Sequence, residues 1–562
     1  MRWERPLGGR EPAAAALLGW LADPHAPGLC LVSGSQGCGK SALLAWLVRH
    51  GSRSGTPAER AVHAVVPDAG QSVRGTVWAL ADQLGVIARS PDELVHALGH
   101  DPRRTVIVLP DLHGGTLVDL VLDLMRLPHL RLVVESRSGG TAHRLLAEVE
   151  CAEMDLDLEQ WRDRGRFAQG RAFPPADQGS GGVAGSCAVV DLSDPAAVCC
   201  ADPWEVTALY EAADGQSHGG LRQAWLRAGQ SLCQEQAPAS RALILLTALG
   251  DRADPDVISV LSELASDASW SMEWSRVRGD LAPPWPGPVS ALAVGKGPLG
   301  GRLLVTAGQG TVRAVDMDDA RSRGRLAVHG VQPVSVSVLG DGTVLLLDDS
   351  GHVHADSTWA SRAAGSGIEG LLNDQPTRLE LLMAALQSHI GTAVASATDD
   401  SVTGVVALGD ASGTVRSFGD VTDSAELHSG PVSALSVLSV PLVGESRATF
   451  VYSGGADGRV RAWSPGHTPM SAPLLERSCR VTALDAAMTA AGPALAVAWG
   501  DGAVDRILWD TGEQRTFRPG PPVRAVALGA DGRVVIGMDE ALTCLAPAPS
   551  HPASEGSGQM FI

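Results

Sequence analysis

Lys40 is one of only two lysines in this 562-residue chain, and its neighbours give it a specific chemical setting. It lies in the stretch Gly34-Ser35-Gln36-Gly37-Cys38-Gly39-Lys40-Ser41, which fits the pattern G-x-x-x-x-G-K-[ST]. Glycines let a loop bend tightly, so that its backbone amides approach an anion. A flexible side chain that ends in a compact ammonium can then reach the outer phosphates of a nucleotide, a task for which arginine is not equivalent. The predicted phosphate ligands are Gly34, Gly37, Cys38, Gly39, Lys40 and Ser41.

A strand and a helix have to position this loop. Residues 29–32 form a short apolar run, as expected of a strand that is buried on both faces of a parallel sheet. Residues 42–48 follow the loop directly and are typical of a helix. This order is that of a P-loop, or Walker A motif, in which the amides and the helix N-terminus attract phosphate and the Ser41 hydroxyl binds Mg²⁺. A glycine-rich turn that fits the pattern by chance is the alternative.

The rest of residues 1–155 alternates strand and helix patterns. Strands are predicted at 61–66, 105–109, 130–134 and 154–158, and helices at 73–84, 117–127 and 141–149. Repeated strand–helix units of this kind predict a doubly wound parallel sheet.

Composition excludes several classes of function. The net charge of −19 and the pI of about 5.2 argue against general binding to nucleic acid. No apolar run is long enough for a membrane helix. The nine cysteines show neither CxxC pairs nor zinc-ligand spacing, so we expect reduced thiols, a cytoplasmic protein and no membrane partner.

The middle of the chain separates two patterns. Residues 156–201 are rich in Gly, Pro and Ser in their central part and are predicted to be a connector. Residues 202–283 are predicted to form a helical domain, because most of them carry apolar residues at helical spacing.

Residues 284–548 repeat a four-strand pattern. The start Gly287-Pro288-Val289-Ser290-Ala291-Leu292 recurs as Gly430-Pro431-Val432-Ser433-Ala434-Leu435, and apolar strands joined by Asp-Gly turns follow such starts. Starts about 40 to 60 residues apart indicate four-stranded units that close radially into a propeller. Six units are clear, and a seventh is considered in 355–400, where residues 378–387 look helical. An open β-sandwich is the alternative fold for this segment. Residues 549–562 are predicted to be a C-terminal tail.

The repeats resemble the blades of WD-repeat propellers, best over 454–463. Trp463-Ser464 stands where that family has Trp-Asp, and the family's Gly-His start is weak here. The resemblance implies a propeller face that binds a protein partner.

The N-terminal half resembles the STAND class of signal-transduction P-loop NTPases, which includes AP-ATPase and NACHT proteins. Beyond the loop, the resemblance depends on Gly9-Arg10-Glu11, on Val106-Ile107-Val108-Leu109-Pro110-Asp111 and on Leu132-Val133-Val134-Glu135-Ser136-Arg137. These stretches are similar to the class's Gly-Arg-Glu motif, its Walker B strand and its strand ending in Thr-Ser-Arg. A P-loop ATPase followed by helices and a WD-repeat propeller recurs in bacteria, and the Ala, Gly and Arg content suits a GC-rich bacterial genome of actinobacterial kind.

The resemblance implies a role for each of three residues. Asp111 holds Mg²⁺ or acts in catalysis, Arg137 senses the phosphates, and Arg10 contributes to the nucleotide pocket. The alternatives are a loop acid at Asp111 and a surface charge at Arg137. Pro110 replaces the first of two acids that usually end the Walker B strand, and Glu135 replaces a threonine, so nucleotide binding is better supported than hydrolysis.

The implied function is an ATP-binding switch that uses ATP and Mg²⁺, hydrolyses ATP slowly if at all, and self-associates in its ATP form. The alternative is a non-hydrolysing WD-repeat scaffold with a degenerate or structural nucleotide site. The expected fold is therefore multidomain: an α/β P-loop NTPase domain, a helical domain, and an all-β propeller of six or seven blades.

Overall fold

The computed structural model describes residues 6, 8–66, 72–101, 103–112, 115–163, 190–213, 215–278, 288–307, 310–328, 331–360, 377–397, 405–419, 421–441 and 447–549. The chain divides into two compact units. The first unit comprises 1–191 and 201–214, and the second unit comprises 192–200 and 215–562. Most of the predicted connector (164–189) and nearly all of the predicted tail (550–562) lie outside the described residues.

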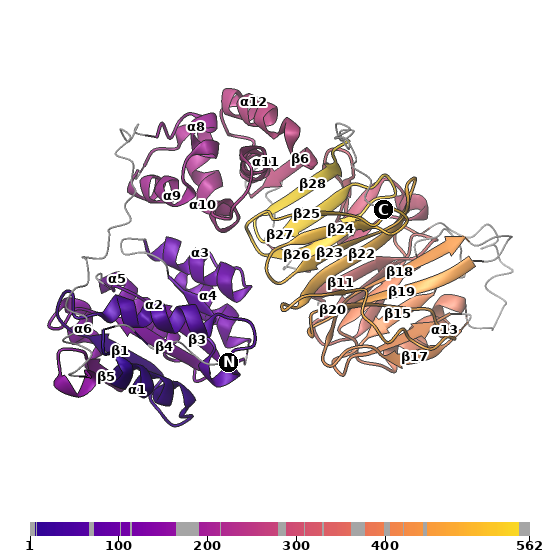
Figure 1. The fold of residues 1–562 in the computed structure, drawn as a ribbon. Coiled ribbons are helices and arrows are strands. Elements are labelled where there is room, and N and C mark those ends of the chain that lie inside the picture. Colours follow the sequence, from indigo (N-terminus) through magenta and orange to yellow (C-terminus); the bar gives the residue numbers. More distant parts are fainter. Residues whose placement is uncertain are drawn as a thin grey trace, which may run out of the picture. The chain divides into compact units, whose positions relative to one another are not determined.

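The first unit contains a five-stranded parallel sheet, as predicted, with the order β2-β3-β4-β1-β5 (Figure 1). Its strands are β1 (Leu29–Ser33), β2 (Ala64–Val65), β3 (Thr105–Leu109), β4 (Leu130–Glu135) and β5 (Cys151–Asp155). β4 lies between β1 and β3, and its Leu132 is in register with Leu29 on one side and Ile107 on the other. Because all five strands are parallel, their carboxyl ends share one edge of the sheet, where chemistry in open α/β sheets is usually placed.

Every residue of β1, β3 and β4 is buried, as expected of a sheet that is covered by helices on both faces. The helices of this unit are α1 (Glu11–Ala22), α2 (Lys40–Gly51), α3 (Val73–Leu84), α4 (Pro91–Gly99), α5 (Gly115–Leu124), α6 (Thr141–Leu146) and α9 (Pro203–Ala212). α1 and α2 pack on one face through Leu17, Leu43 and Leu47, against Val32 and Val133 of the sheet. Continuous apolar strands between helices are what a sheet buried on both faces requires.

Among the residues that the structure describes, four helices of the second unit precede all strands of that unit in the sequence. They are α8 (Pro195–Cys200), α10 (Leu221–Leu232), α11 (Pro238–Ala248) and α12 (Pro255–Leu264). α10 lies against the propeller, where Ser231 Oγ donates to the carbonyl of Arg518 at 2.7 Å. Gly520 allows this approach: it has φ +100°, and a Cβ there would lie 2.5 Å from Cα of Ala228. Short 3₁₀ turns occur in the two units at Ala58–Arg60, Glu159–Trp161, His218–Gly220, Ala265–Asp267 and Gly297–Leu299.

The second unit is dominated by a six-bladed β-propeller, which confirms the predicted repeat architecture. Blade 1 is β7 (Val289–Val294), β8 (Arg302–Ala307), β9 (Thr311–Asp316) and β10 (Ser322–Ala327), and blade 2 is β11 (Pro333–Val338), β12 (Val344–Asp348) and β13 (Val353–Asp356). Blade 3 is β14 (Ala393–Ser396), β15 (Val406–Gly409), β16 (Thr414–Phe418) and β17 (Asp423–Glu426), and blade 4 is β18 (Val432–Pro441), β19 (Arg447–Gly455), β20 (Arg459–Trp463) and β21 (Leu475–Glu476). Blade 5 is β22 (Val481–Thr489), β23 (Gly492–Trp499), β24 (Val504–Leu508) and β25 (Glu513–Phe517).

Blade 6 combines the two ends of the propeller sequence. Its sheet has the order β26-β27-β28-β6, with β26 (Val523–Leu528), β27 (Val534–Met538), β28 (Ala541–Pro547) and β6 (Trp270–Val277). β6 lies within the segment predicted to be a helical domain, so this part of the prediction is wrong for residues 270–277. Trp270, Trp274 and Val277 are its buried residues, and it lacks the Gly-Pro-Val start that marks blades 1 and 4.

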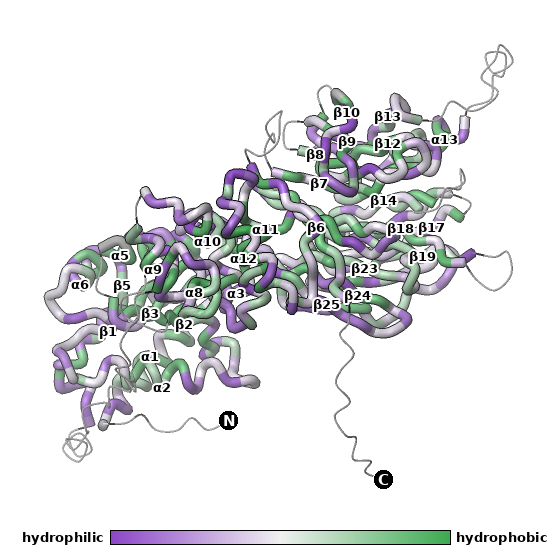
Figure 2. The backbone as a smooth tube through the Cα atoms, turned by 90° about the horizontal axis from the view of Figure 1, so that it is seen from above, coloured by the Kyte–Doolittle hydropathy of each residue, from purple (hydrophilic) through white to green (hydrophobic). Residues whose placement is uncertain are grey.

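The first strands of the blades line the centre of the ring and follow one another from β7 through β11, β14, β18, β22 and β26 back to β7. Figure 2 shows hydrophobic stretches along the propeller strands and more hydrophilic turns between them. Blades stacked in this way bury both faces of each sheet, which a single blade cannot do alone.

No seventh blade is found among the described residues of 355–400. The predicted helix there is confirmed as α13 (Arg378–Gln387), which begins with a capping box between Thr377 and Glu380. α13 packs against β13 and β16, next to the three-stranded blade 2. Among the described residues, no helix combines the length and the apolar character needed to cross a membrane.

Candidate functional site

The glycine-rich loop of residues 34–41 joins the end of β1 to the start of α2 in the first unit. Gly34, Gly37 and Gly39 have φ values of +149°, +77° and +97°, a region that side-chain-bearing residues rarely adopt. A Cβ on Gly34 would lie 2.5 Å from Sγ of Cys38. The glycines are therefore required by the backbone path of the loop, which turns sharply before α2.

Lys40 is the first residue of α2, and its ammonium folds back over the loop. Its Nζ donates to the carbonyl oxygens of Gly34 and Ser35, both at 3.1 Å. The charge is thus held above the loop by neutral carbonyls, without a carboxylate at ion-pair distance among the described residues. An anion bound in the loop would be a stronger partner than these carbonyls.

Ser41 and Glu135 connect the loop to the neighbouring strand. The hydroxyl of Ser41 donates to Oε1 of Glu135, the last residue of β4, at 2.9 Å. Glu135 is 3% exposed, and its second oxygen, Oε2, is buried without a hydrogen-bond partner among the described residues. Burial raises the pKa of Glu135, and the charge of Asp111 raises it further, against the opposing effects of the Ser41 hydroxyl, the Lys40 charge and the backbone amide of Asp111.

Asp111 follows β3 and lies near Glu135. Its φ is +51°, which is uncommon for a residue other than glycine but is tolerated by aspartate better than by most residues. The next amide, that of Leu112, donates to the Glu135 carbonyl at 2.9 Å and so holds the ends of β3 and β4 together. Lys40, Ser41, Asp111 and Glu135 therefore gather at the carboxyl edge of the sheet.

Arg10 lies behind the loop. Its side chain is buried, and its guanidinium donates to the carbonyl oxygens of Leu156 at 2.9 Å, of Trp161 at 3.4 Å and of Cys38. Burial lowers the pKa of Arg10. Through these bonds Arg10 fixes the backbone of the loop relative to the segment that follows β5.

Arg137, the predicted phosphate sensor, is exposed just after β4. Its neighbour Ser138 donates its amide to the Gly34 carbonyl at 3.4 Å, so this segment runs beside the start of the loop. His113, a nearby histidine of the sequence, lies outside the described residues.

Asp157 is a contact of the loop that was not predicted from the sequence. Its two carboxylate oxygens accept from the amide of Ser35 at 2.7 Å and from the hydroxyl of Ser35 at 2.8 Å, and Arg162 lies 3.6 Å away. Burial acts to raise the pKa of Asp157, but these bonds from Ser35, with the charge of Arg162, lower it overall. The available signal was its position just after the last strand, whose carboxyl end meets those of β1 and β4.

Cys38 packs within the loop and is not activated. Burial raises the pKa of its thiol, and the nearby charge of Lys40 only partly opposes this. A thiol that stays protonated is a poor nucleophile and oxidises slowly.

The donor set suits Mg²⁺, which prefers hard oxygen ligands and commonly uses one or two carboxylates together with phosphate oxygens. Ser41, Asp111 and Glu135 offer a hydroxyl and two carboxylates, and the buried Oε2 of Glu135 has an acceptor position left over. Among the described residues no group of three or more His, Cys, Asp or Glu side chains could hold a metal by itself. The residues present therefore fit a metal that is bound together with a phosphate ligand.

Buried polar groups in the propeller are arranged differently. In blade 5, Asp505 accepts from Trp499 Nε1 at 2.8 Å and Arg477 Nη2 at 2.8 Å on one oxygen, and from Thr516 Oγ1 at 2.6 Å on the other.

In blade 4, the His428 ring contacts Asp457 Oδ1 at 3.0 Å and Ser453 Oγ at 2.9 Å. These side chains link strands and turns within blades, and their hydrogen-bonding atoms have partners. They are structural features of the blades.

Comparisons with known proteins add no assignment: no family model matches the chain, and no curated protein matches it.

Proposed function

We propose that this protein binds a nucleoside triphosphate, ATP in the first place, together with Mg²⁺ at the glycine-rich loop, and that it works as a nucleotide-dependent switch of the STAND type. The observation that carries the proposal is the join between β1 and α2. Lys40 and Ser41 stand there after three glycines with positive φ, and Ser41 is bonded to a buried carboxylate. Loop amides and a helix N-terminus favour phosphate at such a position.

Different residues of the chain would bind the phosphates, hold the loop and hold Mg²⁺. The amides of the loop and the Lys40 ammonium bind the phosphates, and Arg10 keeps the loop in shape through its bond to the Cys38 carbonyl. Mg²⁺, when bound, would offset phosphate charge, and Ser41 with Asp111 and Glu135 would hold it. Arg137, exposed beside the loop, is the candidate to sense the outer phosphate.

Hydrolysis is proposed to be slow. In the Walker B strand that this segment resembles, two adjacent acids serve the metal and the attacking water separately. Here Pro110 stands in place of the first acid, and only Asp111 remains. Glu135 supplies a second acid from the next strand, and its raised pKa makes it a better proton acceptor than an ordinary glutamate. A single-turnover measurement with ATP and Mg²⁺ tests this. A nucleotide that stays intact in wild type and in Glu135→Gln favours the alternative, a scaffold with a structural nucleotide.

The propeller is proposed to present its face to a protein partner, and the triphosphate-bound form is proposed to self-associate. Sedimentation velocity of the protein with ATP or with ADP tests the second point. An ATP-dependent increase in the sedimentation coefficient supports it, and identical profiles contradict it.

The two lysines of the chain provide a matched test of the nucleotide site. We expect Lys40→Arg to weaken ATP·Mg²⁺ binding at least about 100-fold, which corresponds to roughly 2.8 kcal/mol, because the broad guanidinium cannot replace the ammonium over the loop. Lys296→Arg, in the propeller, should leave binding unchanged. Equal binding of ATP by wild type and Lys40→Arg, measured by isothermal titration calorimetry, would refute the site.

A further inference from the structure

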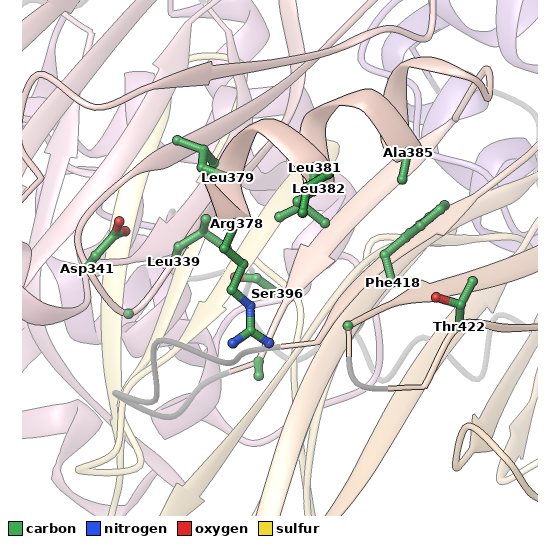
Figure 3. Close-up of a pocket in the computed structure, with 13 residues that line it drawn as sticks. Leu339, Asp341, Arg378, Leu379, Leu381, Leu382, Ala385, Ser396, Phe418 and Thr422 are labelled. Carbon is green, nitrogen blue, oxygen red and sulfur yellow. The ribbon is translucent and has the colours of Figure 1, made fainter. Parts of the chain in front are cut away.

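Arg506, on β24 of blade 5, is only 5% exposed. Arginines are rarely buried unless they are paired, because their charge is costly to remove from water. Figure 3 shows the more usual placement: Arg378, at the start of α13, is exposed beside a cavity of about 270 Å³ next to this helix. The buried charge of Arg506 therefore calls for a partner.

The side chains next to Arg506 in the sheet do not supply that partner. Ala496 lies opposite it on β23, and Arg515 lies opposite it on β25. Alanine has no polar side-chain atom, and a like charge directly across a sheet is destabilising. Nε of Arg506 is buried without a hydrogen-bond partner among the described residues.

The acids in this part of the propeller are bonded to other groups. Glu513, whose charge acts on Arg506, accepts from Nε of Arg515. Asp531, in the turn between β26 and β27, accepts from the amide of Arg533 at 3.0 Å and from its Nε. Burial lowers the pKa of Arg506, and the charge of Arg515 lowers it further, against the opposing effect of Glu513. The described residues thus leave the charge of Arg506 incompletely offset.

The guanidinium of Arg506 crosses from blade 5 to the turn between β26 and β27 of blade 6. Gly532 in this turn has φ +82°, and a Cβ there would lie 3.1 Å from Nη2 of Arg506. A side chain at position 532 would therefore crowd the guanidinium, and glycine leaves this edge uncovered. The neighbouring residues Ala530 and Asp531 are exposed, so a small solute can approach the turn from solvent.

We propose that this point between blades 5 and 6 binds a small carboxylate, whose oxygens pair with the guanidinium of Arg506 beside Gly532. One carboxylate balances one guanidinium, and the planar fork of arginine matches its two oxygens. A doubly charged anion such as phosphate would leave an excess negative charge in a buried place, which is costly. Because Arg506 is 5% exposed, the opening admits acetate and excludes a branched acid. The site is independent of the proposed nucleotide function.

Thermal unfolding of the full chain in sodium acetate, with sodium chloride exchanged to keep the ionic strength constant, tests the proposal. A ligand that binds only the folded state raises the unfolding temperature by mass action. We expect the propeller transition to rise by about 2–4 °C when acetate reaches roughly ten times its dissociation constant. Pivalate, which has the same charge on a branched carbon, and phosphate should each give less than about a third of this rise.

Arg506→Met removes the charge and keeps most of the length of the side chain. In chloride this variant should be at least as stable as wild type, because replacing a buried ion by an apolar side chain of similar volume is often neutral or stabilising. Its rise in acetate should be lost. Arg321→Met, on an exposed arginine of the same propeller, is the matched control and should keep the wild-type rise.

The comparison of acetate with pivalate and phosphate uses wild-type protein and decides the question if Arg506→Met does not fold. The absence of a rise in acetate, or an equal rise in acetate and pivalate, would overturn the proposal. So would a rise in Arg506→Met that equals that of wild type, because acetate would then stabilise the propeller without this guanidinium.

Discussion

Two buried carboxylates, Glu135 in the first unit and Asp505 in the propeller, differ in how completely their oxygens are hydrogen-bonded. Asp505 receives bonds from Trp499, Arg477 and Thr516 that together use both of its oxygens. Glu135 accepts one side-chain bond, from Ser41 on Oε1, and its Oε2 is buried without a hydrogen-bond partner among the described residues. A fully bonded buried acid stabilises a fold, whereas an incompletely bonded one is costly and marks a place where a ligand completes the shell. The contrast supports the proposal that the buried acid of the blades serves the fold and that the buried acid of the sheet edge serves a ligand.

The largest effect on stability is expected when the bonded acid is removed. Asp505→Ala leaves the indole of Trp499, the hydroxyl of Thr516 and one side of the Arg477 guanidinium without their acceptor. We expect a loss of about 3–5 kcal/mol, seen as a lower unfolding temperature of the propeller and faster hydrogen exchange in blade 5.

A matched control for this variant is Asp319→Ala, which removes a half-exposed carboxylate that pairs with the Arg321 side chain at 3.2 Å and accepts from its amide at 2.9 Å. It should cost about 0–1 kcal/mol. Equal losses in the two variants would show that the blade 5 network carries no special stability.

The same kind of change at Glu135 should act on ligand binding and not on the fold. Glu135→Gln keeps an acceptor for Ser41 and removes a buried charge, so the first unit should be as stable as wild type or more stable. Its affinity for ATP in the presence of Mg²⁺ should fall at least about tenfold, roughly 1.4 kcal/mol.

Titration calorimetry with and without Mg²⁺ measures this effect, and Glu148→Gln, on an exposed glutamate of the same unit, is the control. A destabilised Glu135→Gln protein with unchanged Mg²⁺ dependence would reverse the assignment made for the two carboxylates.

The stability of the two units should change in opposite directions as the pH falls. Burial lowers the pKa of His428 below its usual 6.5, although its bond to Asp457 acts to raise it. The unfolded chain therefore takes up the proton first, and the propeller loses stability as the pH falls below about 6.5. Burial raises the pKa of Glu135 above its usual 4.5, so the nucleotide-free first unit gains stability as the pH falls through the folded pKa of Glu135.

Calorimetry at about pH 7.5 and about pH 5 should resolve these two opposite trends. His428→Gln should reduce the acid sensitivity of the propeller, and Glu135→Gln should remove the gain in the first unit. If both transitions shift in the same direction by the same amount in wild type and in these variants, other groups dominate the titration.

The smallest effect concerns Asp157. Its bonds to Ser35 lie at the surface, and Asn at this position can still accept one of them. Asp157→Asn should therefore change the stability of the first unit and its affinity for ATP by less than about 1 kcal/mol. A larger loss of ATP affinity, measured by the same titration, would make Asp157 part of the binding site.

The sequence predicted the elements whose patterns are local and failed where distant segments cooperate. The helix at 73–84 and the strand at 105–109 were predicted with the bounds that the structure has, because each carries its own apolar spacing. β6 was missed because its partner β28 begins at Ala541, far along the chain.

The same limit applies to the candidate site. Lys40 and Ser41 belong to one short motif that the sequence displays, Asp111 follows an apolar strand, and Glu135 ends the next one. Ser41 is adjacent to Glu135 because β4 lies beside β1 in the sheet. The order of the strands in the sheet cannot be read from the two local patterns. Asp157 follows β5, and its contact with Ser35 depends on the pairing of β5 with β1.

The pairing of β6 with β28 has a consequence for synthesis on the ribosome. β6 leaves the exit tunnel before any other strand of the ring, and its partner emerges after all of them. Until then an apolar strand with two tryptophans has an unpaired hydrogen-bonding edge, which is a template for joining another chain. A nascent polypeptide that stalls or ends before Ala541 would leave the circle open, with this strand free to seek a substitute partner.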